Sequence, residues 1–157
     1  MRDFAAMNAL VEKYGKDKVA VLGFICNQFG HQSNGDEREF VEVLKHVRPG
    51  GGFVCAAGLD LFKKCDVNGE KQLPLWKWLK ERQRIPFGDA GDNKGNGVDD
   101  NDALTQTDKA VLWAPIARGD VAWNFEKFLI GPDGTFVRRY SRYFPIGDIE
   151  PDIDAIL

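Results

Sequence analysis

The sequence has few of the residues that build metal and redox centres. Its 157 residues include two histidines, His31 and His46, and three cysteines, Cys26, Cys55 and Cys65. The cysteines lack the C-x-x-C spacing of zinc sites and dithiol motifs, so we predict no bound metal. An odd number of unpatterned cysteines is typical of a reducing compartment, and we expect the protein to be cytoplasmic.

Long apolar runs and a strong net charge are also absent. No segment approaches the roughly 20 apolar residues that span a bilayer, and the opening Met1–Phe4 lacks the features of a signal peptide. A net charge of −3 argues against a general nucleic-acid binder. We therefore expect no membrane and no nucleic-acid partner. The length and the hydrophobic content of 43% predict one packed domain, residues 1–157.

Periodic apolar residues predict alternating helices and strands. Asp3 is the expected N-cap of the first helix, and the run Lys18–Cys26 is expected to form a strand buried on both faces. Pro-Asp-Gly at 132–134 predicts a tight turn between two strands. The predicted elements are a helix at 3–14, a strand at 18–26, a helix at 36–47, a strand without defined limits within 53–67, a helix from 73, strands at 121–130 and 135–140, and a helix at 148–157. This order suits an α/β, thioredoxin-like sandwich.

The stretch 85–112 is rich in glycine, aspartate and asparagine, and we interpret it as a long surface loop. Its acidic residues raise the alternative of a small calcium-binding module. The EF-hand spacing of acidic ligands is absent, which favours the solvated loop. The acidic residues concerned are Asp89, Asp92, Asp99, Asp100 and Asp102.

Trp123 and Asn124 stand at the start of the first hairpin strand. An indole N–H and a carboxamide N–H on adjacent residues can be aimed at one anionic atom. The alternative is that Trp123 belongs to the core and Asn124 caps a turn.

Amide side chains crowd the loop that follows strand 18–26. Loops at the carboxyl ends of parallel strands often carry functional sites. The alternative is that these amides satisfy backbone groups of the loop itself. The residues are Asn27, Gln28, Gln32 and Asn34.

Three arginines, Arg138, Arg139 and Arg142, gather at the end of the hairpin. Guanidinium groups bind carboxylates through paired hydrogen bonds, so the cluster is a candidate site for a small carboxylate ligand. The alternative is a solvated strand edge whose charges deter pairing.

Five segments make the sequence resemble the glutathione peroxidases. They are 22–32, 47–53, 64–69, 121–129, and 138–142 followed by 149–153. The resemblance runs from Met1 to Leu157 and points to the tetrameric, selenocysteine-type branch. It implies a thioredoxin-like α/β sandwich with the first strands missing, and a homotetramer in the full-length form.

The resemblance also implies the chemistry of the site. Hydroperoxides are reduced by a selenocysteine or cysteine, with glutathione as co-substrate and no bound cofactor. Among the two loop glutamines the resemblance favours Gln32, whereas Gln28 is expected to be structural. The implied catalytic residues are Gln32, Trp123 and Asn124, and the implied glutathione-binding residues are Arg2, Arg48 and Arg142.

None of the three cysteines occupies the family's peroxidatic position. By resemblance that position falls just upstream of Met1, and we expect Met1 to be an internal methionine of a longer selenoprotein whose UGA codon was read as a stop. The alternative is a catalytically dead scaffold that lacks the nucleophile.

Overall fold

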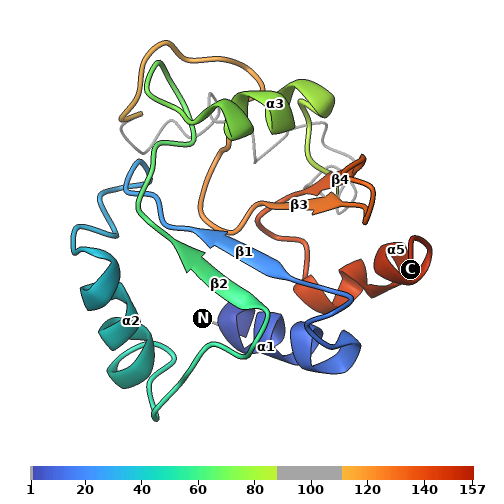
Figure 1. Ribbon diagram of the computed structural model, residues 1–157. Coiled ribbons are helices and arrows are strands. Elements are labelled where there is room, and N and C mark those ends of the chain that lie inside the picture. Colours follow the sequence, from blue (N-terminus) through green and yellow to red (C-terminus); the bar gives the residue numbers. More distant parts are fainter. Residues whose placement is uncertain (1, 88–110) are drawn as a thin grey trace.

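The computed structural model describes residues 2–87 and 111–157, except the side chain of Arg2. Helices and strands alternate along the chain (Figure 1). In order they are α1 (Arg2–Tyr14), β1 (Val21–Phe24), α2 (Glu37–His46), β2 (Leu59–Phe62), α3 (Pro74–Arg82), β3 (Lys127–Ile130), β4 (Phe136–Tyr140), the 3-10 helix η1 (Ile146–Ile149) and α5 (Glu150–Asp154). The candidate calcium loop falls almost entirely outside the described residues.

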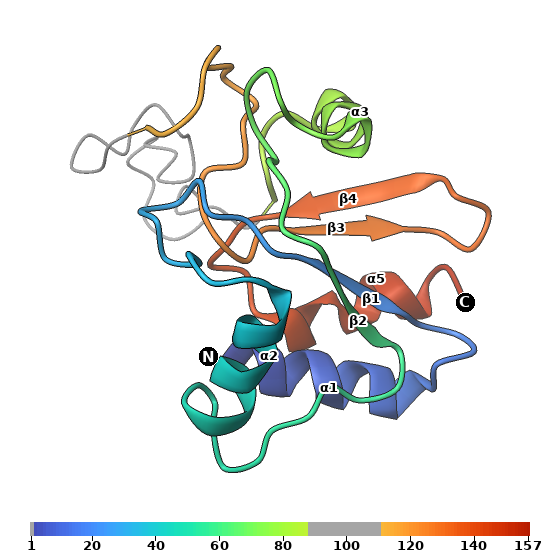
Figure 2. The same ribbon diagram turned by 60° about the vertical axis from the view of Figure 1, so that its left-hand side comes forward.

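The strands form two separate pairs. β1 pairs in parallel with β2, with Val21 opposite Leu59, and β3 pairs antiparallel with β4. A parallel pair requires a long crossover connection, and here the crossover contains α2. α1 and α2 lie on one side of β1 and β2, and the hairpin and α3 lie on the other (Figures 1 and 2).

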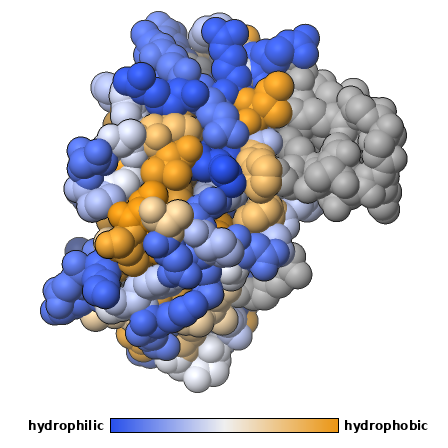
Figure 3. All heavy atoms as spheres, turned by 90° about the vertical axis from the view of Figure 1, so that its right-hand side faces the viewer, coloured by the Kyte–Doolittle hydropathy of each residue, from blue (hydrophilic) through white to orange (hydrophobic). Residues whose placement is uncertain are grey.

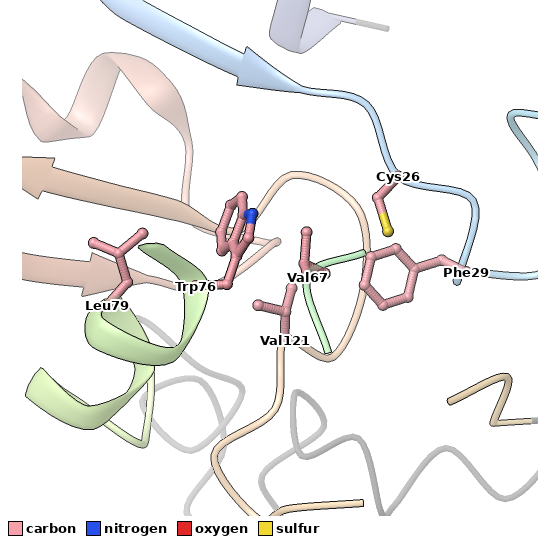
Figure 4. Close-up of a cluster of buried hydrophobic side chains, with 6 residues drawn as sticks. All are labelled: Cys26, Phe29, Val67, Trp76, Leu79 and Val121. Atoms are coloured by element: carbon pink, nitrogen blue, oxygen red, sulfur yellow. The ribbon is translucent and has the colours of Figure 1, made fainter. Parts of the chain in front are cut away.

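Buried side chains pack on both sides of the β1–β2 pair. On one side, Phe4 and Val11 of α1 pack with Leu44 of α2 and Leu59 of β2. On the other side a second cluster joins α3 to three loops, which follow β1, follow β2 and precede β3 (Figure 4). Its buried members are Cys26, Phe29, Val67, Trp76, Leu79 and Val121. Burying a large apolar side chain contributes about 1.5–3 kcal/mol, so this cluster ties the loops to α3.

The predicted burial of the first strand on both faces is wrong. Leu22 is 53% exposed, and the other three residues of β1 are only half-buried. Gly23 lies on the opposite face, where an added Cβ would meet Leu61 Cδ2 at 2.7 Å. Phe24, on the same face as Leu22, is half-buried against Trp76, so both faces of β1 are covered in part and neither is covered completely. Apolar side chains also gather between polar ones on the surface seen in Figure 3.

Helix limits differ from the predictions at two places. α1 already begins at Arg2, so Asp3 lies in its first turn and is not the N-cap. A negative charge in that turn still interacts favourably with the helix dipole. The predicted last helix is divided into η1 and α5, because Pro151 fits only the first turn of an α-helix.

The first hairpin strand is much shorter than the predicted 121–130. The backbone N–H of Val121 donates to Asn68 Oδ1, and that of Ala122 donates to Glu126 Oε1. Phe125 has a φ of 68°, which breaks an extended strand. Trp123 and Asn124 therefore lie in an irregular segment before β3.

A fully buried ion pair anchors this irregular segment. Arg139 of β4 donates from Nε to Glu126 Oε2 at 2.7 Å, and their side chains are 0% and 1% exposed. The guanidinium also donates to the backbone carbonyls of Gln83, Arg84, Gly119 and Asp120. Arg139 thus links the hairpin to the end of α3 and to the segment before β3.

Replacing Arg139 should destabilise the protein far more than replacing its neighbour. Arg139→Met leaves the Glu126 carboxylate buried without its partner, and we expect a loss of about 3–5 kcal/mol. Arg138 pairs with Asp152 at side-chain exposures of 38% and 28%, so Arg138→Met should cost about 1 kcal/mol. Urea unfolding followed by circular dichroism measures both, and equal losses would contradict this account.

Candidate functional site

Gln32 and Asn124 meet although 92 residues separate them. The Nδ2 atom of Asn124 donates to Oε1 of Gln32 at 3.0 Å. Trp123 borders the same place, because a Cβ added to Gly30 would lie 3.4 Å from the indole and 3.8 Å from Cγ of Gln32. The fold therefore brings the loop after β1 against the segment before β3, and all three predicted catalytic residues lie at their junction.

The backbone is left-handed beside both amides. His31, just before Gln32, has a φ of 52°, and Phe125, just after Asn124, has a φ of 68°. Such conformations of non-glycine residues cost on the order of 1–3 kcal/mol and persist where the surroundings impose them. The ring of Phe125 is held edge-on by Phe4 of α1, with centroids 5.8 Å apart. The Phe4 contact thus places the Asn124 segment beside α1, and the hydrogen bond joins Gln32 to that segment.

The side-chain amide of Gln28 binds backbone groups and does not take part in the Gln32–Asn124 hydrogen bond. Its Oε1 accepts from the N–H groups of Val67 and Asn68, both at 3.0 Å. Its Nε2 donates to Asn68 O at 2.9 Å. Gln28 is 7% exposed, so its amide is committed to holding two loops together. Gln32, in contrast, is exposed and contacts Asn124.

Arg142 is the predicted arginine that lies at the junction. Its guanidinium carbon is 5.8 Å from the centre of the Trp123 ring and 4.5 Å from that of Tyr143. Nη2 donates to the Tyr143 hydroxyl. Nε is buried and has no hydrogen-bond partner among the described residues. A cation over the indole adds positive potential next to the amide donors.

Lys127 fixes the loop that carries Arg142. Its ammonium donates to the backbone carbonyls of Ser141 at 3.1 Å, Arg142 at 3.3 Å and Phe144 at 2.6 Å. Three carbonyls around one cation hold the turn after β4 in a defined conformation.

The predicted cluster of Arg138, Arg139 and Arg142 is wrong as a single site. Successive residues of a strand point to opposite faces, so Arg138 reaches Asp152 whereas Arg139 is buried on Glu126. Only Arg142 lies beside Trp123.

Of the other two predicted arginines, only Arg48 has a described side chain. Arg48 is exposed beyond the C-terminal end of α2, whereas Gln32 precedes its N-terminal end. α2 has ten residues and is about 15 Å long, so the helix separates them. The side chain of Arg2 lies outside the described part of the chain.

The cysteines do not resemble activated nucleophiles. Cys26 is packed in the cluster of Figure 4 with its Sγ 3.6 Å from Gln28 Oε1. Burial raises the pKa of the Cys26 thiol to about 11, and burial also raises the pKa of Cys55 and Cys65. A reactive cysteine needs a lowered pKa, so these thiols act as small apolar groups.

Three supporting residues escaped the sequence analysis: Asn68, Lys80 and Asp120. Asn68 pairs with both backbone groups of Val121, and the buried Lys80 donates to Asp120 at 2.8 Å. One signal was available, because Lys80 follows Trp76 by four residues and so falls on the apolar face of its helix.

Within 2–87 and 111–157, no group of three His, Cys, Asp or Glu could hold a metal ion. The helices of the same residues are too short or too polar to cross a membrane.

The fold consists of a parallel β-α-β unit, an antiparallel hairpin and a closing helix, and the connecting loops carry amide and indole donors. This arrangement defines a thioredoxin-like α/β protein. The chain belongs to the glutathione peroxidase family, because the family model described as glutathione peroxidase matches residues 1–80 and the sequence relatives agree.

The relatives match over the whole chain. The present chain is 49% identical to glutathione peroxidase 1 of Rattus norvegicus over 156 residues, which cover 99% of this chain and 71% of the rat protein. Identity to glutathione peroxidase 1 of Oryctolagus cuniculus is 50%, covering 100% of this chain and 72% of the rabbit protein.

Solved structures agree with the fold. The apo form of Trgpx superposes with a TM-score of 0.53 at 23% identity, covering 99% of this chain and 71% of that one. T. cruzi GPX1 gives 0.56 at 24% identity, with 98% and 70% covered. The predicted α/β, thioredoxin-like class is confirmed.

Cys26 should react very slowly with alkylating reagents in the folded protein. At pH 8 a thiol with a pKa of about 11 is roughly 0.1% thiolate, whereas an ordinary thiol of pKa about 8.5 is roughly a quarter thiolate. We expect iodoacetamide to label Cys26 at least ~100-fold more slowly in buffer than in urea. Peptide mass spectrometry measures the two labelling rates. Equal rates in the two conditions would contradict the burial of this thiol.

Proposed function

We propose that Gln32, Trp123 and Asn124 form the donor set of a glutathione peroxidase that reduces hydrogen peroxide and organic hydroperoxides with glutathione. The observation that carries the proposal is the hydrogen bond from Asn124 to Gln32 beside the Trp123 ring. Uncharged N–H donors from two rigid loops favour an anionic selenium or sulfur over its protonated form.

In this proposal the chalcogenolate attacks one peroxide oxygen, the O–O bond breaks, and water or an alcohol leaves. The selenenic or sulfenic acid so formed condenses with one glutathione thiol and releases water. A second glutathione attacks the mixed intermediate, releases oxidised glutathione and regenerates the chalcogenolate. The donor set stabilises the anion at the first and last steps.

We propose that Arg2, Arg48 and Arg142 receive the carboxylates of glutathione. Arg142 has the strongest support, since its guanidinium borders Trp123 and its buried Nε is unpartnered among the described residues. Arg48 lies at the far end of α2 from Gln32, so we expect a smaller contribution from it.

The nucleophile is proposed to be a selenocysteine or cysteine outside these 157 residues. The support is that burial raises the pKa of all three cysteines present, which favours the thiol over the nucleophilic thiolate. A selenoprotein, a cytoplasmic location and a homotetramer of the full-length form belong to the same proposal. The same observation favours the second candidate function, an inactive scaffold, for the 157-residue chain by itself.

The 157-residue chain should therefore be nearly inactive. The assay couples peroxide reduction by glutathione to glutathione reductase and compares this chain with a version extended upstream through its own coding sequence, carrying cysteine at the nucleophile position. Turnover by the short chain within tenfold of the extended one would refute the proposed nucleophile. In the extended enzyme, Asn124→Ala should lower the rate with peroxide by about 10²–10³.

Arg142→Ala in the extended enzyme should weaken the glutathione step selectively. A charge-assisted hydrogen bond contributes about 1.5–3 kcal/mol, so kcat/KM for glutathione should fall ~10–100-fold while that for peroxide changes little. Arg82→Ala is the matched control, because Arg82 also lies over an indole, 5.3 Å from the Trp78 ring. Equal effects of the two variants would count against Arg142 as a glutathione residue.

A further inference from the structure

Lys80 is a buried cation behind the donor set. It lies near the C-terminal end of α3 and is 8% exposed. Its ammonium donates to Val67 O at 3.0 Å, Asn68 Oδ1 at 3.0 Å and Asp120 Oδ1 at 2.8 Å. An ammonium has three N–H donors, so these acceptors use all of them. Burial lowers the pKa of Lys80, and the hydrogen bond to Asp120 opposes that shift.

The acceptors of Lys80 lie in the loop after β2 and in the segment before β3, and Gln28 ties the first of these to the loop after β1. Val67 and Asn68 are held by the Gln28 amide, four residues before Gln32. Asn68 accepts from Val121 N at 2.9 Å and donates to Val121 O at 2.8 Å. Val121 precedes Trp123 by two residues, so Asn68 links the Trp123 segment through its side chain and the Gln32 loop through its backbone groups and Gln28.

Asp120 closes the network on the other side. Its second carboxylate oxygen, Oδ2, accepts from Trp113 Nε1 and from Ala117 N, both at 2.8 Å. Oδ1 faces Lys80, so removing the ammonium leaves this buried oxygen without that partner. A buried charge without a partner is costly enough to force the surrounding turn to rearrange.

We propose that Lys80 is a positioning residue that keeps the Gln32 loop and the Trp123–Asn124 segment in register through Asn68 and Asp120. The residue before it in the chain, Leu79, packs in the apolar cluster of Figure 4. The geometric claim stands by itself, and the catalytic consequence rests on the proposed function.

The geometric claim can be tested on the 157-residue chain by NMR. The reporter is the side-chain amide of Asn124, which donates to Gln32. The Gln32→Ala variant gives the resonance positions of this amide when the hydrogen bond to Gln32 is absent. Lys80→Met should move the Asn124 amide resonances at least halfway toward their positions in Gln32→Ala.

Leu79→Ala is the matched control, because it opens a cavity on the same helix turn without touching the polar network. It should leave the reporter in place. Unshifted resonances in Lys80→Met, or equal shifts in both variants, would overturn the proposal. If Lys80→Met does not fold, Asp120→Asn replaces it, with the same expected shift and the same contradicting result.

The catalytic consequence is measured in the extended enzyme at a temperature where all variants are folded. Lys80→Met should lower kcat/KM for hydroperoxide ~10–100-fold, because the loss of one donor to an anion lowers the rate by about 10²–10³ and this variant displaces the donors without removing them. Leu79→Ala should stay within about threefold of the parent enzyme. An NMR shift without loss of activity would overturn the positioning role. If the parent extended enzyme lacks activity, the proposed function fails, and the NMR result still decides the geometric claim.

Discussion

The buried Arg139–Glu126 pair is the interaction on which the other features depend. One carboxylate oxygen of Glu126 accepts from Arg139, and the other accepts from the N–H of Ala122 at 2.6 Å. The ion pair therefore fixes the bend that carries Trp123 and Asn124. Because the guanidinium also binds carbonyls at the end of α3 and before β3, a single side chain sets the positions of three segments.

Polar interiors of this kind cost desolvation free energy, and they are maintained only when every member is satisfied. Here the charges are compensated in two neighbouring groups, Arg139 with Glu126 and Lys80 with Asp120. Both groups contact the segment 117–126, which precedes β3. An apolar core could have the same volume, but it would not specify where each backbone N–H of that stretch points.

Much of the fold follows from sequence pattern, while the contacts of the site follow from it only in part. Helical spacing predicted α1, α2 and α3, and Pro-Asp-Gly predicted the hairpin turn. The late start of the first hairpin strand could not be predicted from the sequence. Tertiary hydrogen bonds to Asn68 and Glu126 override the β-propensity of residues 121–126. Adjacent arginines look alike in sequence, yet strand alternation buries Arg139 and leaves Arg138 at the surface. A strand within 53–67 was expected without defined limits, because the four residues of β2, Leu59–Phe62, give too short a pattern.

Within the described residues, no backbone ladder connects the β1–β2 pair to the β3–β4 pair. In a continuous sheet, regularly spaced amides would fix the separation of two loops at its edge almost independently of side-chain identity. Here that separation is set by side chains alone, through cores such as the cluster in Figure 4. Within these cores the polar contacts of Asn68, Lys80 and Asp120 have defined directions, so the accuracy of the junction depends more on buried hydrogen bonds and charge pairs than on the volume of one apolar side chain.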